Sequence, residues 1–126
     1  MSTATPAIEV SVTTRYLRDE SSPDQSRYAF SYTITLRNVG NVAARLLTRQ
    51  WIVRDASGHS EEVRGDGVVG QHPHLQPGES FQYSSGAVIA TPVGTMQGSY
   101  RWQLDGGREF DTPIPEFTLS GPRTLH

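Results

Sequence analysis

Apolar residues recur at every second position along most of the chain, which is the period of β-strands with one buried and one solvated face. Ile8, Val10 and Val12 open the first such stripe over residues 8–16, and the strongest stripe covers residues 28–37. The pattern returns over residues 46–53, 60–64, 81–85, 96–104 and 108–119. Because no segment has a credible helical period, we predict an all-β protein of about seven strands.

Turn sequences separate the expected strands, as in Asn38-Val39-Gly40-Asn41 and Asp105-Gly106-Gly107. Short strands punctuated in this way are typical of an antiparallel β-sandwich, and an immunoglobulin-like arrangement fits best. In chain order the strands would be A, B, C, C′, E, F and G, with A, B and E in one sheet and G, F, C and C′ in the other. The charged segment 60–64 and the proline-bearing segment 108–119 are expected at sheet edges.

Aromatic residues are the expected centre of the core. Trp51 and Trp102 would lie on neighbouring strands of one sheet, where packing must replace the disulfide of antibody domains. Tyr100 stands where a tyrosine corner would place a buried ring with its hydroxyl bonded to backbone. The alternative for Tyr100 is an ordinary core aromatic.

Composition limits the classes of function. The 126 residues are the size of one domain, with an ordered core over about 8–119 and flexible ends at 1–7 and 120–126. The chain has no cysteine, and its eleven basic residues are all scattered arginines. Disulfides, thiolate or lysine chemistry and a nucleic-acid-binding patch are therefore not expected. No apolar run is long enough for a signal peptide or membrane helix, which favours a cytoplasmic protein.

Residues 65–70 match G-x-G-x-x-G, the glycine pattern of dinucleotide-binding turns. That pattern binds phosphate at the start of a helix, whereas residues 71–78 contain two prolines and a glycine. We therefore place the motif on a loop, with glycines that serve its backbone path. The alternative is an anion-binding nest of backbone N–H groups, made by Gly65, Asp66, Gly67 and Gly70 with Arg64 adjacent.

Other polar residues give only weak candidates for chemistry. His72 and His74 form an H-x-H pair that could hold a metal, but Pro73 stands between them in an expected loop and no acidic pair is near in sequence. Glu61 and Glu62 would face opposite sides of a strand and so could not act together as acid and base. We predict no catalytic residues, no cofactor and no enzyme activity.

The chain resembles the bacterial ApaG family along nearly its whole length, from about residue 8 to residue 117. The matching strings are Tyr32-Thr33-Ile34-Thr35-Leu36 with Asn38 and Gly40, Arg49-Gln50-Trp51, Gly65-Asp66-Gly67-Val68-Val69-Gly70, Leu75-Gln76-Pro77-Gly78-Glu79 with Phe81, Tyr83, Ser85 and Gly86, Thr91-Pro92-Val93-Gly94-Thr95-Met96, Gly98-Ser99-Tyr100 and Ile114-Pro115-Glu116-Phe117. The resemblance implies a single fibronectin type III-like domain over residues 1–126, without an assigned enzymatic activity. Related domains occur in F-box proteins and in a polymerase-interacting protein, and the family is linked to cobalt resistance and magnesium efflux.

Two hypotheses of function follow. The favoured one is a non-catalytic protein-protein interaction module that binds an unknown protein partner through loops or a strand edge, and neither nucleic acid nor membrane. The alternative is binding of a small ligand, either a nucleotide or pyrophosphate or a divalent metal, through the loop from Gly65 to Gly70.

Overall fold

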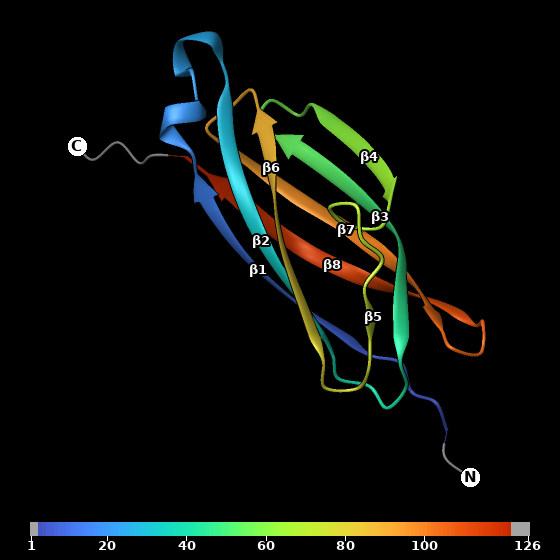
Figure 1. The fold of residues 1–126 in the computed structure, drawn as a ribbon. Coiled ribbons are helices and arrows are strands. Elements are labelled where there is room, and N and C mark those ends of the chain that lie inside the picture. Colours follow the sequence, from blue (N-terminus) through green and yellow to red (C-terminus); the bar gives the residue numbers. More distant parts are fainter. Residues whose placement is uncertain (1–2, 122–126) are drawn as a thin grey trace.

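Two antiparallel sheets pack face to face in the computed structural model, which describes residues 3–121 (Figure 1). The first sheet has the order β1 (Ile8–Tyr16), β2 (Tyr28–Asn38), β6 (Ser80–Ile89). The second has the order β4 (Ser60–Asp66), β3 (Ala44–Asp55), β7 (Val93–Leu104), β8 (Glu109–Ser120), and the short β5 (His74–Leu75) also pairs with β3. Two 3₁₀ turns, η1 (Arg18–Glu20) and η2 (Pro23–Gln25), connect β1 to β2.

The predicted all-β sandwich is confirmed, including the division of its strands between the sheets. Strands A, B and E correspond to β1, β2 and β6, and strands G, F, C and C′ correspond to β8, β7, β3 and β4. The two-residue strand β5 was not predicted, because its sequence context is rich in turn residues. Of the ends that we expected to be flexible, residues 1–2 and 122–126 lie outside the described residues.

The core lies between the sheets and is rich in aromatic side chains. Trp51 and Trp102 are 3% and 0% exposed on the adjacent strands β3 and β7, as predicted. The Trp51 ring packs against Tyr32 of the opposite sheet with 5.4 Å between ring centroids. Aromatic pairs at this separation add to the stabilisation that burial provides.

Tyr100 is a core aromatic and does not form a tyrosine corner. Its hydroxyl hydrogen-bonds the hydroxyl of Tyr83, 2.5 Å away on the opposite sheet, instead of returning to backbone. Burial raises the pKa of Tyr83 to about 12 and raises the pKa of Tyr100 as well. The pair therefore stays neutral and satisfies two buried hydroxyl groups across the core.

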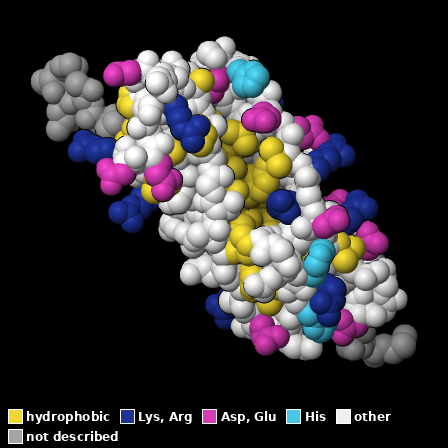
Figure 2. Space-filling model, turned by 45° about the horizontal axis from the view of Figure 1, so that its top comes forward, with side chains coloured by type: hydrophobic (Ala, Val, Ile, Leu, Met, Phe, Trp, Pro, Cys, Tyr) yellow, Lys and Arg dark blue, Asp and Glu magenta, His cyan; other side chains and the backbone are white. Residues whose placement is uncertain are grey.

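The two long sides of the sandwich differ. On one side β1 packs beside β8, so the sheet edges cover the core. On the other side a cavity opens between β4 and β6, and its lining residues come from both sheets. Figure 2 shows this side as a hollow band of hydrophobic side chains bordered by charged ones. We call the hollow between β4 and β6 the open-side groove.

Candidate functional site

The glycine motif is divided between a strand and a tight turn. Gly65 and Asp66 are the last residues of β4, which corrects the prediction that the whole motif lies on a loop. After Gly67, Val68 and Gln71 exchange two backbone hydrogen bonds of 2.8 and 2.9 Å around a two-residue turn. Both central residues have positive φ, as a type I′ turn requires.

A close contact within the chain or a positive φ explains the presence of each glycine in the motif. Gly65 lies opposite Arg49 in the strand register, and a Cβ there would come within 2.7 Å of the Arg49 guanidinium. Gly67 has φ +63°, and a Cβ there would collide with the carbonyl oxygen of Gln71. Gly70 has φ +79° in the turn. Between these glycines the Val68 side chain is fully buried, so the motif packs the chain onto the core.

Four backbone groups of the motif are already engaged, namely two N–H groups and two carbonyls. The Gly67 N–H donates to the Leu47 carbonyl, and the Val68 N–H donates to the Gln71 carbonyl, each at 2.8 Å. The carbonyls of Asp66 and Gly67 accept hydrogen bonds from Arg49 Nη1 at 2.9 and 2.8 Å. An anion nest needs converging, unpaired N–H groups, whereas this loop directs carbonyl oxygens at a cation of its own chain.

Val69 at the tip of the turn is strained. Its φ is +44°, in the left-handed region that β-branched residues rarely adopt, and its side chain is 53% exposed. Type I′ turns favour asparagine or glycine at this position. Neither turn geometry nor burial accounts for valine at position 69.

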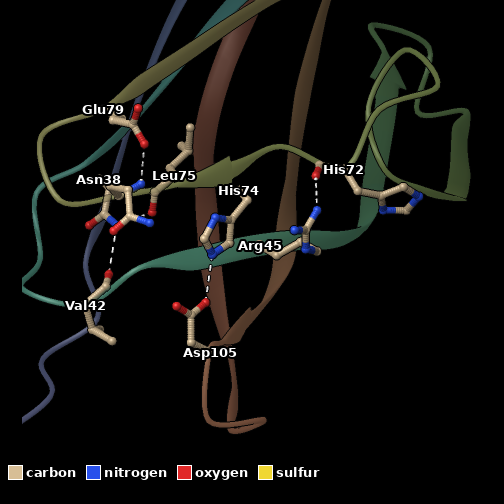
Figure 3. Close-up of polar contacts among 9 residues, drawn as sticks. Asn38, Val42, Arg45, His72, His74, Leu75, Glu79 and Asp105 are labelled. Carbon is tan, nitrogen blue, oxygen red and sulfur yellow. Dashed lines mark hydrogen bonds and ion pairs between the residues drawn. The ribbon is translucent and has the colours of Figure 1, made fainter.

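The two candidate metal-binding histidines are held by separate partners. His74 lies on β5, which corrects its placement in a loop, and its Nε2 contacts Asp105 Oδ1 at 2.7 Å (Figure 3). His72 Nδ1 contacts the Leu46 carbonyl at 3.1 Å. Among residues 3–121 no group of three or more His, Cys, Asp or Glu side chains could hold a metal ion.

Asn38 joins three segments at the end of the sandwich where β5 lies. Its buried side chain donates from Nδ2 to the carbonyls of Val42 and Leu75, each at 2.9 Å, and accepts the Gly40 N–H at 2.9 Å (Figure 3). In the sequence Asn38 reads only as a turn residue. Its buried role depends on β5, which local pattern did not predict.

Apolar side chains from both sheets line much of the open-side groove, together with Arg49, Glu61 and Ser85. Trp51 and Met96 come from the five-stranded sheet, Tyr32 from the three-stranded sheet, and Val63 from the edge strand β4. Its volume is about 210 Å³. Val63 is 40% exposed and lies opposite Trp51 in the register, so its side chain faces the groove. We expected this charged edge strand to be a candidate interaction surface, but its sequence did not single out Val63 or predict the groove beside it.

Arg49 brings an uncompensated positive charge to the apolar groove. The side chain is half-buried and faces inward, as does that of its register partner Tyr100. Nη1 donates to two backbone carbonyls, and no carboxylate of residues 3–121 forms an ion pair with Arg49. Its Nε and Nη2 groups therefore remain available to an acceptor outside the chain.

A second depression lies on the outer face of the five-stranded sheet. Its volume is about 630 Å³, and Arg64, Gly65 and Asp66 line it together with Arg101 and Asp111. The structure thus brings together three of the predicted ligand-binding residues here, while Gly67 and Gly70 belong to the turn. Two of its three lining arginines are already paired, because Arg101 Nε lies 3.0 Å from Asp111 and Arg64 Nε lies 2.5 Å from Glu62, whereas the third, Arg49, also lines the open-side groove. The hydrogen bond that Arg101 donates to the Asp111 carboxylate also raises the pKa of Arg101.

In residues 3–121 the structure contains no helix of the length and hydropathy that a membrane span needs.

Comparison with known proteins gives one consistent answer. The family model of the ApaG domain matches residues 18–104. Protein ApaG of Thiobacillus denitrificans is 56% identical over 119 residues, which is 94% of each chain, and that of Pseudomonas putida is 55% identical over the same share. The crystal structure of the ApaA protein from Bordetella pertussis is similar to this fold with a TM-score of 0.91 at 46% identity, covering 94% of this chain and 97% of that one. The chain belongs to the ApaG family.

Proposed function

We propose that this chain is a non-catalytic, cytoplasmic protein-interaction module that docks a partner protein on its open side. The observation that carries the proposal is the apolar open-side groove, which lies between two free strand edges. An apolar hollow rimmed by charged residues is typical of a protein-binding surface.

The polar groups of the molecule support a binding role over a catalytic one. His72 and His74 each contact a separate group of the protein, and the buried hydroxyls of Tyr83 and Tyr100 satisfy one another. A nucleophile, a base and an orienting group in mutual contact would be the mark of covalent catalysis. No such triad occurs among the hydrogen bonds of residues 3–121. Any role of the family in cobalt resistance or magnesium efflux would then act through the bound partner.

The size of the groove favours side chains of a protein over a free small molecule. Pockets that enclose drug-sized ligands have volumes of about 300 to 1,000 Å³. The groove, at about 210 Å³, is smaller than this range and continues along the strand edges into a second hollow beside Val53 and Glu61. An elongated hollow with apolar side chains in one part and polar ones in the other suits a segment of polypeptide.

Substitution of Val63 by arginine is expected to abolish docking without unfolding the domain. The side chain is 40% exposed, so the long cation can reach solvent, but its stem and charge would occupy the groove beside Arg49. Val93→Arg is the matched control, since Val93 is 44% exposed and does not line the groove. The measurement is affinity capture from lysate of the source organism, with the unfolding temperature of each variant as a check on folding.

We expect the wild type and Val93→Arg to capture the same specific protein, and we expect Val63→Arg to lose it. Equal retention by both variants, or loss by both with intact folding, would show that the partner does not dock in the groove.

Binding of a small phosphate ligand near Gly65–Gly70 is the second candidate, and the depression lined by Arg64, Gly65 and Asp66 is the observation in its favour. We expect this candidate to fail, because the Gly67 and Val68 N–H groups already donate to backbone carbonyls. Titration with pyrophosphate to millimolar concentration should leave the backbone amide shifts of residues 65–70 unchanged. Saturable shifts confined to these amides would instead support the ligand hypothesis.

A further inference from the structure

The free edge of β6 lacks the usual protection against strand pairing. Natural edge strands carry charges or prolines that prevent the addition of another strand. Apart from the two-residue β5, residues 3–121 contain four edge strands, of which β1 contains Glu9 and Arg15, β4 is largely charged, and β8 contains acidic residues and two prolines. β6, over Ser80–Ile89, contains neither a charged residue nor a proline. This edge is therefore chemically open to a further strand.

Hydrogen bonds at the end of β2 fix which of its residues bond toward β6. The Asn38 N–H donates to the Glu79 carbonyl before β6, whereas the Val39 N–H donates to the Ala7 carbonyl before β1, each at 2.9 Å. In an antiparallel pair, alternate residues direct both their N–H and C=O groups to the same neighbour. Even-numbered residues of β2 consequently bond toward β6, and odd-numbered residues bond toward β1.

The strand register shows which residues of β6 form backbone hydrogen bonds with β2. Ile34 pairs with Tyr83 and Leu36 pairs with Phe81, so the odd-numbered residues of β6 bond to β2. The even-numbered residues then direct their backbone N–H and C=O groups to the free edge. Apart from Ser80 at the start of the strand, these residues are Gln82, Ser84, Gly86 and Val88.

Arg49 in the groove favours a strand that carries a negatively charged side chain. Part of β6, from Ser85 to Val88, lines the same groove as Arg49. A strand added at β6 would direct alternate side chains toward the groove, one of them close enough for the free N–H groups of Arg49. Glu61 lies opposite Val53, four positions along β4 from Gly65, and gives the far end of the groove the opposite charge.

We infer that β6 binds an extended segment of the partner protein as a fourth strand of its sheet, with apolar side chains in the groove and a carboxylate on Arg49. This inference rests on the proposed function and specifies the chemistry of the partner. Backbone hydrogen bonds along the edge give affinity, and the groove selects the side chains on one face of the added strand.

A second copy of this chain is a poorer occupant of the edge. Pairing β6 with β6 would bring together two strands without a single charged residue. No carboxylate of the added strand would then reach Arg49, and the guanidinium would be covered without a counter-charge, which is unfavourable. The charge of Arg49 thus favours a different chain that carries an acidic residue.

A capped synthetic peptide, Thr-Val-Thr-Glu-Thr-Leu-Thr-Val-Thr, is a direct probe of this inference. Its glutamate, leucine and valines share one face of a strand, and its threonines form the other face. The first control peptide has glutamine in place of glutamate, which removes the charge and keeps the shape. Two further controls carry N-methyl groups on one or the other alternate set of amides.

Amide hydrogen exchange of the ¹⁵N-labelled protein should locate the added strand. Bound peptide is expected to slow exchange by about tenfold or more at the amides of Gln82, Ser84, Gly86 and Val88, and not at the amides that already bond to β2. Only one of the two N-methylated peptides should lose binding, because only alternate amides face β6. The glutamine peptide should bind about tenfold more weakly to the wild type, and to Arg49→Gln it should bind as the glutamate peptide does.

Three results would overturn the inference. One is unchanged exchange at these four amides with millimolar peptide, and another is equal binding of the glutamate and glutamine peptides to the wild type. The third is protection of the same amides by raised protein concentration alone, which would assign the edge to a second copy. If the peptide fails while Val63→Arg still loses the captured partner, strand addition is wrong and the proposed docking function stands.

Discussion

Replacement of Trp51 by alanine is expected to lower the free energy of unfolding by about 3 to 5 kcal/mol, the usual range for large aromatic residues in a core. Trp51 is 3% exposed and packs against Tyr32 of the opposite sheet and edge-on against Phe117 of β8. Its loss would leave a cavity under the open-side groove, where no neighbouring strand can move in to fill it. Urea denaturation of the two proteins would measure the difference.

Ile52→Ala is the matched control for Trp51. Ile52 is the next residue of β3, faces the outer side of the sheet and is only partly buried. It should cost about 1 kcal/mol, since less apolar surface is removed from the protein. A loss below about 1 kcal/mol for Trp51→Ala would mean that the two sheets are not held together at this ring.

The second large effect is expected for Gly67→Val. A β-branched residue at φ +63° is strained, and the added Cβ would also collide with the carbonyl of Gln71. Together these effects should cost about 3 kcal/mol. The unfolding free energy from denaturant titration is again the measurement.

Substitutions at two other glycines distinguish backbone strain from steric collision as causes of the lost stability. Gly70 has φ +79° with open space around a Cβ, so Gly70→Ala should cost only the backbone strain of about 1 to 2 kcal/mol. Gly106 has neither a positive φ nor a near neighbour, and Gly106→Ala should change stability by about 0.5 kcal/mol or less. Similar losses at positions 67 and 70 would refute the close approach to Gln71.

Alternation of apolar residues predicted the seven longer strands, and the immunoglobulin-like assignment predicted their division between the sheets. Residues 28–37 and 8–16 alternate clearly, and their predicted bounds match β2 and β1 to within one residue. Local pattern succeeds here because the side-chain period of a strand is a local property. The charges of residues 60–64 likewise placed β4 correctly at an edge.

Features that depend on strand register could not be predicted from local sequence. Arg49 and Gly65 are 16 positions apart, and only the pairing of β3 with β4 brings the guanidinium over the glycine. Leu75 is buried because β5 pairs with Ala44, although its neighbours in sequence are turn residues. The open-side groove is missed for the same reason, since its lining comes from strands of both sheets.

The same glycine pattern has different physical causes in different folds. In a nucleotide-binding turn the glycines let the backbone approach a phosphate. In this chain Gly65 makes room for Arg49, and Gly67 and Gly70 supply positive φ around the buried Val68. The pattern is therefore evidence of a demanding backbone path and not, by itself, of a ligand.

Photo-crosslinking in living cells tests most directly whether the open side is the docking surface. A photoreactive phenylalanine analogue would replace Val63 in one variant and Val93 in another, since both side chains are similarly exposed. We predict that position 63 gives one discrete crosslinked protein and that position 93 does not. A specific crosslink from position 93 with none from position 63 would contradict the assignment of the groove between β4 and β6 as the binding site.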